Sequence, residues 1–193
     1  MFFILKLVRT LKSNLYWSRV RMLIDDSKEY DLVWNKVYEK LKFKPAYNDR
    51  GHSLHANLPF EIQGDFAVYG IEKMTDSQID AMEKKIKKIF VEVTEKGNCM
   101  YALDWQHSVF LFDPRKEEEQ KSFWKEDNNY FGRGYNIYFP SLYPDGDYHF
   151  FIDESFEFGY LGHPWRQEIW VFGDKLINKI NEIYKALGWI KIR

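Results

Sequence analysis

The sequence predicts a single α+β domain in which one antiparallel β-sheet packs against about three α-helices. Two capping-box segments precede runs whose apolar side chains recur at helical spacing, a pattern typical of amphipathic helices. Residues 101–172 contain 21 of the 36 aromatic residues and are divided by short turns, as sheet segments are. Strands joined by short turns pair in the antiparallel direction. A chain of 193 residues can bury one core around such a sheet without disulfides.

Three helices are expected, and each has its own boundary signals. The first begins at the capping-box segment Asp26-Ser27-Lys28-Glu29 and stops at Pro45. The second follows the capping box Thr75-Asp76-Ser77-Gln78, with Gly97 as its C-cap. The third follows Gly173 and ends at Gly188. Helical spacing in the first of these helices predicts a buried face made of Trp34, Tyr38 and Leu41.

The remaining apolar segments predict strands. They are residues 59–71 (one strand or two), 100–105, 108–112, 135–139, 148–152, 156–161 and 168–172. Residues 100–105 and 108–112 form a hairpin across Gln106 and His107, and residues 135–139 and 148–152 flank a Pro-Asp-Gly-Asp turn. Residues 117–133 are expected to form a charged loop.

The first 24 residues differ from the rest of the chain, since they carry five basic residues and no acidic one. They lack the cleavage site of a signal peptide and the apolar length of a membrane span. We expect residues 1–24 to be a basic extension to a domain over residues 25–193. Translation from Met22 is one explanation, and a packed or frayed N-terminal helix is the other.

Composition excludes several classes of function. A net charge of −1 leaves no basic footprint for nucleic acid, and we expect no nucleic-acid partner and no membrane span. The single cysteine, Cys99, excludes an internal disulfide and fits a cytoplasmic protein. No glycine-rich phosphate loop or nucleophile motif is present, so no cofactor is predicted. The histidines His52 and His55 lack carboxylates at ligand-like spacing, so no metal site is predicted.

Two groups of residues are candidates for a functional site. His107 could act as a base with Asp104 or Asp113, although a histidine in a hairpin turn is more often simply exposed. The second group is the connection Gly162-His163-Pro164-Trp165-Arg166, which places an imidazole, an indole and a guanidinium on a stiff backbone. It could hold an anion, a sugar face or a peptide. The favoured alternative is a structural corner, with Trp165 buried and His163 bonded to a backbone carbonyl.

Several motifs resemble the bacterial domain-of-unknown-function family 2716 over about residues 27–187. The most specific is Leu161-Gly162-His163-Pro164-Trp165, and the turn Tyr143-Pro144-Asp145-Gly146-Asp147-Tyr148 supports it. The resemblance implies a small, soluble bacterial protein, and it brings no activity, cofactor or catalytic residue.

These observations leave two classes of function. The preferred one is a non-catalytic binding or interaction module, immunity-like or regulatory, with a protein partner. The alternative is a small metal-independent hydrolase that uses His163 or His107 with Asp104 or Asp113.

Overall fold

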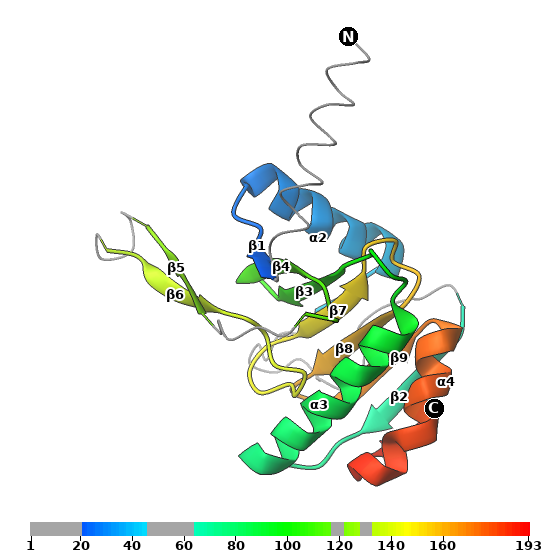
Figure 1. Cartoon of the computed structure of the whole chain (residues 1–193). Coiled ribbons are helices and arrows are strands. Elements are labelled where there is room, and N and C mark those ends of the chain that lie inside the picture. The colour runs from blue at the N-terminus through cyan, green and yellow to red at the C-terminus, as the bar shows by residue number, and fades with distance from the viewer. Residues whose placement is uncertain (1–20, 46–63, 117–121, 128–132) are drawn as a thin grey trace.

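Strands from both halves of the chain form one antiparallel sheet, with helices on both of its faces (Figure 1). The computed structural model describes residues 21–45, 64–116, 122–127 and 133–193. Within these ranges the sheet has eight strands in the order β1-β4-β3-β7-β8-β9-β2-β10. Every neighbouring pair is antiparallel. The architecture confirms the predicted α+β class.

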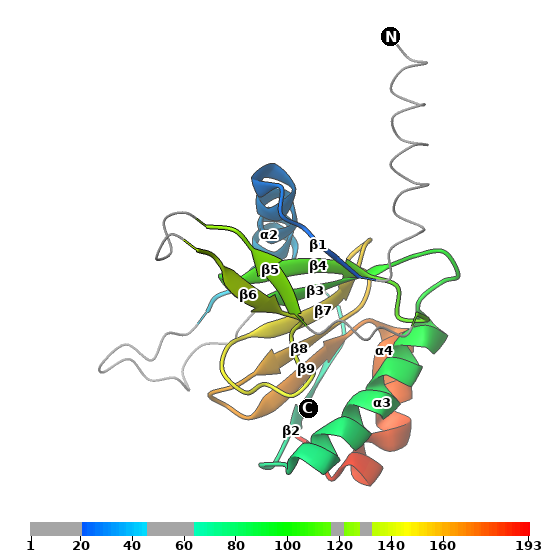
Figure 2. The same cartoon turned by 60° about the vertical axis from the view of Figure 1, so that its left-hand side comes forward.

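The strands of the large sheet are short. They are β1 Arg21–Leu23, β2 Phe66–Gly70, β3 Met100–Asp104, β4 Ser108–Phe112, β7 His149–Asp153, β8 Gly159–His163, β9 Glu168–Phe172 and β10 Ile190–Lys191. A second, two-stranded sheet, which we call the arm, is formed by β5 Ser122–Lys125 and β6 Tyr135–Tyr138. The arm projects from one side of the molecule (Figure 2).

Two apolar cores lie on the two faces of the large sheet. Helix α2 (Ser27–Leu41) covers one of them, the α2 face, whereas α3 (Asp76–Val93) and α4 (Asp174–Ile183) cover the other, the α3 face (Figure 1). Successive residues of a strand point to opposite faces, so Phe150 of β7 belongs to the first core and Phe151 to the second. The central strands are therefore buried on both sides, which explains their nearly continuous apolar sequences.

Helix α2 begins as predicted, because Oδ1 of Asp26 accepts a hydrogen bond from the backbone N–H of Glu29 at 2.9 Å. Trp34 and Leu41 are buried in the core of the α2 face. The prediction for Tyr38 is wrong, since 41% of its surface is exposed. Its ring lies at the rim of that core, where its hydroxyl accepts a hydrogen bond from Nε1 of Trp105 at 3.1 Å.

The second capping box is confirmed, since Thr75 and Gln78 bond reciprocally and α3 begins directly after Thr75. The predicted end of this helix at Gly97 is wrong. α3 ends at Val93 because Thr94 already has an extended backbone. Gly97 instead adopts a φ of 95° in the turn that leads to β3.

The last helix, α4, follows Gly173 as predicted and continues into a 3-10 turn, Tyr184–Leu187. Gly188 ends that turn in the left-handed conformation, with a φ of 74°, as a C-cap glycine does. Among the helices in the described ranges, none is both long and apolar enough to cross a membrane.

The predicted hairpin of β3 and β4 is confirmed, and its turn lies at residues 105–107. Two expectations about the next segment are wrong. The predicted charged loop over residues 117–133 contains β5, and β6 pairs with β5 rather than with β7. β5 is difficult to recognise because it has only four residues and its partner lies beyond a further polar stretch.

The sheet extends into the segment that the sequence assigns to the basic extension. The three residues of β1 pair with Phe112, Leu111 and Phe110 of β4. Ile24 is buried in the core of the α2 face. Residues 21–24 therefore pack with the domain, whereas residues 1–20 lie outside the described ranges.

Candidate functional site

Three connections meet at one end of the large sheet, which we call the turn end. β3 ends at Asp104, which is paired with His149 at the start of β7, and His149 is paired with Gly162 of β8. The β3–β4 turn with His107, the loop before β7 and the β8–β9 turn with Trp165 therefore lie close together. Most of the predicted site residues are in this region.

The turn end has two sides, because strand residues alternate between the faces of the sheet. Asp104 and its partner His149 point to the α3 face, in register with core residues two positions further along each strand. Trp105 and Tyr148, one position away, belong to the core of the α2 face. His163 contacts the ring of Tyr148 and lies on that same side. His163 and Asp104 are thus on opposite faces of the sheet.

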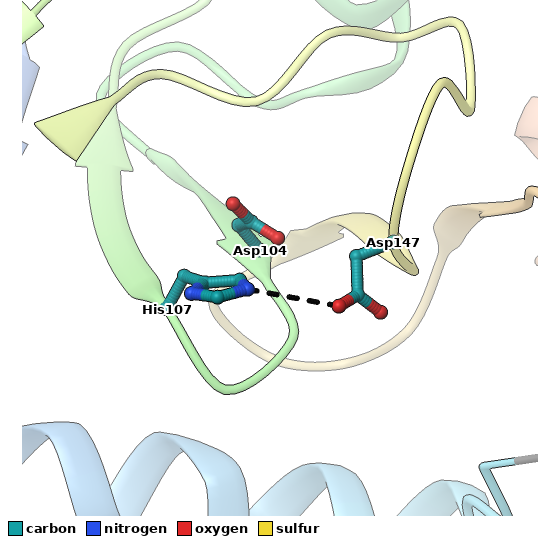
Figure 3. Close-up of side chains that lie close together, drawn as sticks. All are labelled: Asp104, His107 and Asp147. Atoms are coloured by element: carbon teal, nitrogen blue, oxygen red, sulfur yellow. Dashed lines mark ion pairs between the residues drawn. The ribbon is translucent and has the colours of Figure 1, made fainter. Parts of the chain in front are cut away.

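Asp104, His107 and Asp147 form a cluster at the turn end, the Asp104 cluster (Figure 3). One oxygen or nitrogen from each lies within 4.8 Å of the others. Nε2 of His107 is 3.7 Å from Oδ2 of Asp147, and Nε2 of His149 is 3.7 Å from Oδ1 of Asp104. Burial raises the pKa of Asp104, while the neighbouring charges of His149 and His107 oppose that rise.

His163 is fully buried. Its Nε2 is 3.4 Å from the hydroxyl of Tyr148, so its partner is a phenol rather than the backbone carbonyl expected for a structural corner. Desolvation, together with the nearby charge of Arg166, lowers the pKa of His163 to about 3. The imidazole is therefore neutral at pH 7 and has no access to solvent.

Trp165 and Arg166, in the β8–β9 connection, contact residues of the neighbouring strands and of the loop before β7. Trp165 is half-buried and its ring lies 4.9 Å from that of Tyr148. Nε of Arg166 lies 2.9 Å from Oε2 of Glu168 in an ion pair, and its guanidinium lies over the ring of Trp170 at 5.9 Å. These contacts favour the structural corner over an open binding site.

Asp113 lies at the opposite end of the sheet from the histidines. It follows β4, whose five residues span about 16 Å between it and His107. Oδ1 of Asp113 pairs with Nη1 of Arg115 at 3.1 Å, and Arg115 also donates to the carbonyl of Thr94. The structure therefore does not bring Asp113 together with His107 or His163.

Cys99 is half-buried. Desolvation, with the nearby charge of Glu154, raises its thiol pKa to about 11, so at pH 7 it is protonated and a poor nucleophile. His52 and His55 lie outside the described residues.

Two clefts of the described chain lie away from the turn end. The larger, of about 710 Å³, lies between the end of α2 and the start of α4, and Glu39, Lys42, Asp65 and Phe156 are among its lining residues. The smaller, of about 420 Å³, is lined by Asn98 and Lys175 among others, and both clefts include Asp174. None of the predicted site residues lines either cleft.

The arm presents a second candidate surface. Its inner face is packed, since Ile137 is buried and the ring of Phe123 lies 5.3 Å from that of Phe110. Its outer face carries Trp124 and Tyr138, which are 57% and 64% exposed. Neither ring was predicted as part of a site, because Trp124 was assigned to a loop and Tyr138 to a strand with another partner. The two adjacent aromatic residues of β5, in an otherwise polar stretch, were the signal available for this strand.

Asp147 and His149 were also missed as site residues, because they are about 40 positions from Asp104 and reach it only through the pairing of β3 with β7. The turn Pro-Asp-Gly-Asp, followed directly by a strand that begins with histidine, was the signal available for them.

Comparisons with known proteins give a family and a relative. The family model described as "Protein of unknown function (DUF2716)" matches residues 25–177. An "Uncharacterized protein YxiI" from Bacillus subtilis (strain 168) is 30% identical over 156 residues, which cover 78% of this chain and 86% of that protein. No solved structure matches.

Proposed function

The chain belongs to the DUF2716 family, and we propose that it is a non-catalytic binding module that holds a protein partner on the outer face of its arm. The matched region, residues 25–177, includes both strands of the arm. The observation that carries the proposal is the exposure of Trp124 and Tyr138 on a strand pair whose other face is packed. Large aromatic side chains supply most of the binding energy in protein interfaces.

The strands of the arm that carry these rings contact the rest of the domain. Nζ of Lys125 lies 2.8 Å from Oδ1 of Asp25, which ties the end of β5 to the segment between β1 and α2. On the inner face, Phe123 and Ile137 pack against the core of the α3 face. A rigid aromatic surface binds with little loss of conformational entropy, and this favours a docking role.

The chemistry of the outer face fits a protein better than a nucleic acid. Trp124, Asn136 and Tyr138 are its exposed side chains, and none of them is charged. Nucleic-acid sites need a cluster of basic residues, and this face offers none among its described residues. An indole, a phenol and an amide suit an extended segment of a partner protein, which can also add to the edge of a two-stranded sheet.

The positions of the predicted catalytic residues argue against the hydrolase alternative. His163 is enclosed and neutral, and it lies on the opposite face from Asp104. Asp113 lies at the other end of the sheet. His107 and Asp104 do lie together, but neither lines either of the two clefts described above.

Photocrosslinking in cells tests this function. A benzophenone amino acid at Trp124 or Tyr138 should capture one partner, and the same group at Leu32 should not. Leu32 is the matched control because it is 57% exposed but lies on α2. With that partner purified, Trp124→Ala and Tyr138→Ala should each weaken binding at least tenfold, or about 1.4 kcal/mol.

Leu32→Ala should leave that affinity unchanged. Equal crosslinking from all three positions, or unchanged affinity in the Trp124 and Tyr138 variants, would contradict the proposal.

A further inference from the structure

We propose that the Asp104 cluster binds a divalent transition-metal ion of the Zn²⁺ class, with His149 as a fourth ligand. The cluster gathers Asp104 from β3, His107 from the β3–β4 turn and Asp147 from the loop before β7 (Figure 3). This site is independent of partner binding by the arm, so each proposal can fail without the other.

The orientation of His149 is the first reason for a cation. Its Nδ1 lies 2.9 Å from the backbone oxygen of Ser141, and a carbonyl oxygen can only accept a hydrogen bond. Nδ1 therefore carries the proton of the neutral ring, and Nε2 carries a lone pair. The Nε2 atom lies 3.7 Å from Oδ1 of Asp104. Metal-binding histidines are commonly fixed in this way, with the second nitrogen bonded to a carbonyl or carboxylate.

The carboxylate of Asp104 is the second reason. Its Oδ1 is buried and has no hydrogen-bond partner among the described residues. A buried carboxylate oxygen without a hydrogen-bond donor is costly, because it has lost its water and has only the imidazole of His149, 3.7 Å away, beside it. A cation between Asp104 and His149 would satisfy both groups at once.

The third reason is that hydrogen bonds hold the loop before β7, which contains Asp147. Oε1 of Glu83 on α3 accepts hydrogen bonds from the hydroxyl of Ser141 at 3.0 Å and from the backbone N–H of Leu142 at 2.9 Å. The hydroxyl of Tyr160 donates to the carbonyl of Leu142 at 2.7 Å. The loop before β7 is therefore fastened both to α3 and to β8, as the support of a metal ligand must be.

Asp147 is oriented in the same way. Its Oδ1 accepts a hydrogen bond from the backbone N–H of Tyr148 at 2.8 Å, which leaves Oδ2 directed toward His107. Figure 3 shows the imidazole of His107 and the carboxylate of Asp147 facing each other beside Asp104.

The distances suit an ion of this size. Two donors on a tetrahedral ion with bonds of about 2.1 Å are about 3.4 Å apart. The ligand atoms of Asp104, His107 and Asp147 all lie within 4.8 Å of one another, and the His107–Asp147 separation is 3.7 Å. His149 lies outside this group and is 3.7 Å from Asp104, so its imidazole would have to move toward the ion to become the fourth ligand.

The ligand set then selects the class of metal. Two imidazoles and two carboxylates suit Zn²⁺ and its first-row neighbours, whereas Ca²⁺ and Mg²⁺ prefer oxygen ligands throughout. The imidazole of His107 is 64% exposed, so the ion would be reached from solvent on that side.

Zn²⁺ titration of chelator-treated full-length protein tests the proposal. We expect one Zn²⁺ per chain at this site, and His107→Gln and Asp147→Asn should each weaken its binding at least tenfold. Both side chains are partly or largely exposed, and asparagine keeps the oxygen that bonds Tyr148, so these variants should fold. Their melting temperatures without metal should match that of the wild type.

Asp145→Asn is the matched control, because Asp145 is exposed on the same loop and its removal changes the net charge by the same amount. Its Zn²⁺ affinity should stay within about twofold of the wild type. Co²⁺ should give the intense visible absorption of a tetrahedral centre in the wild type and the control, and lose it in His107→Gln.

Two results would overturn the proposal. Absence of Zn²⁺ binding by the wild type would mean that the Asp104 cluster holds no ion. Binding that persists unchanged in both ligand variants would place the ion elsewhere, for example at His52 and His55.

Discussion

Gly162 lies so close to Pro144 that a side chain at this position would be crowded. A Cβ there would be 3.0 Å from Cβ of Pro144, and both residues belong to stiff backbone. Gly162→Ala should therefore lower the free energy of unfolding by about 1–3 kcal/mol through overpacking, as measured by urea denaturation. Gly146→Ala is the control, since a Cβ at that position meets no atom within 4 Å. Equal losses from the two substitutions would contradict this account.

His163 gives the protein a pH dependence of definite sign. Its pKa in the folded state is about 3, below its ordinary 6.5, so between these values the unfolded chain binds a proton that the folded chain does not. The stability that this group contributes is complete above pH 6.5 and is lost as the pH falls toward 3. From pH 6.5 to 5, the wild type should lose about 1–2 kcal/mol more than His163→Gln in denaturant titrations.

The control for this prediction is Leu32→Ala, because Leu32 is 57% exposed and carries no titratable group. Its loss of stability over the same pH interval should equal that of the wild type. A wild-type slope that is unchanged in His163→Gln would mean that His163 takes up its proton in the folded state.

The packing of helix α2 against the sheet depends on Trp34. This side chain is 6% exposed and its ring meets that of Phe150 edge-on at 5.8 Å. Trp34→Ala should lower the free energy of unfolding by about 3–5 kcal/mol, through lost burial and the cavity left behind. Leu32→Ala on the same helix should change it by less than about 0.5 kcal/mol, because Leu32 is 57% exposed. A denaturant titration in which the two variants match would show that α2 packs differently.

Elements with local signals could be predicted from the sequence. The N-cap bond of Asp26 before α2 and the capping box before α3 act within four residues, and the sequence contains all of their parts. The error at Tyr38 arose because helical spacing marks a broad apolar stripe, whereas α2 buries a narrower one. β5 was missed because its pairing with β6 is not encoded by a short turn.

The candidate site was less predictable, because it depends on strand register. The predicted strand over residues 156–161 placed His163 in the connection that follows it. Phe156 in fact has a φ of 63° and ends a turn, and β8 runs from Gly159 to His163. That shift puts His163 inside the strand, on the face opposite to Asp104. Asp147 joins Asp104 and His107 only through the pairing of β3 with β7, which no local pattern reveals.

For the molecule as a whole, the sheet ends in two very short strands. β1 has three residues at one edge and β10 has two at the other. Short edge strands limit unwanted pairing between molecules. β1 also makes part of the N-terminal segment belong to the sheet, because its residues precede α2 and pair with β4 at the edge.

A chain shortened to begin at Met22 retains two of the three β1–β4 pairs, Met22 with Leu111 and Leu23 with Phe110, and also keeps Ile24. Its melting temperature should therefore stay within about 5 °C of that of the full chain, which corresponds to about 2 kcal/mol at this size. A larger drop would show that residues 1–21 contribute to the core.

A chain that begins at Asp25 is the matched comparison. It loses all of β1 and the side chain of Ile24, which is only 5% exposed in the core of the α2 face. It also uncovers the edge of β4, whose backbone groups would then have to bond to water. We expect it to melt more than about 5 °C below the chain that begins at Met22. If the two shortened chains melt together, β1 adds no stability, and the packed domain starts at α2 as the sequence alone had placed it.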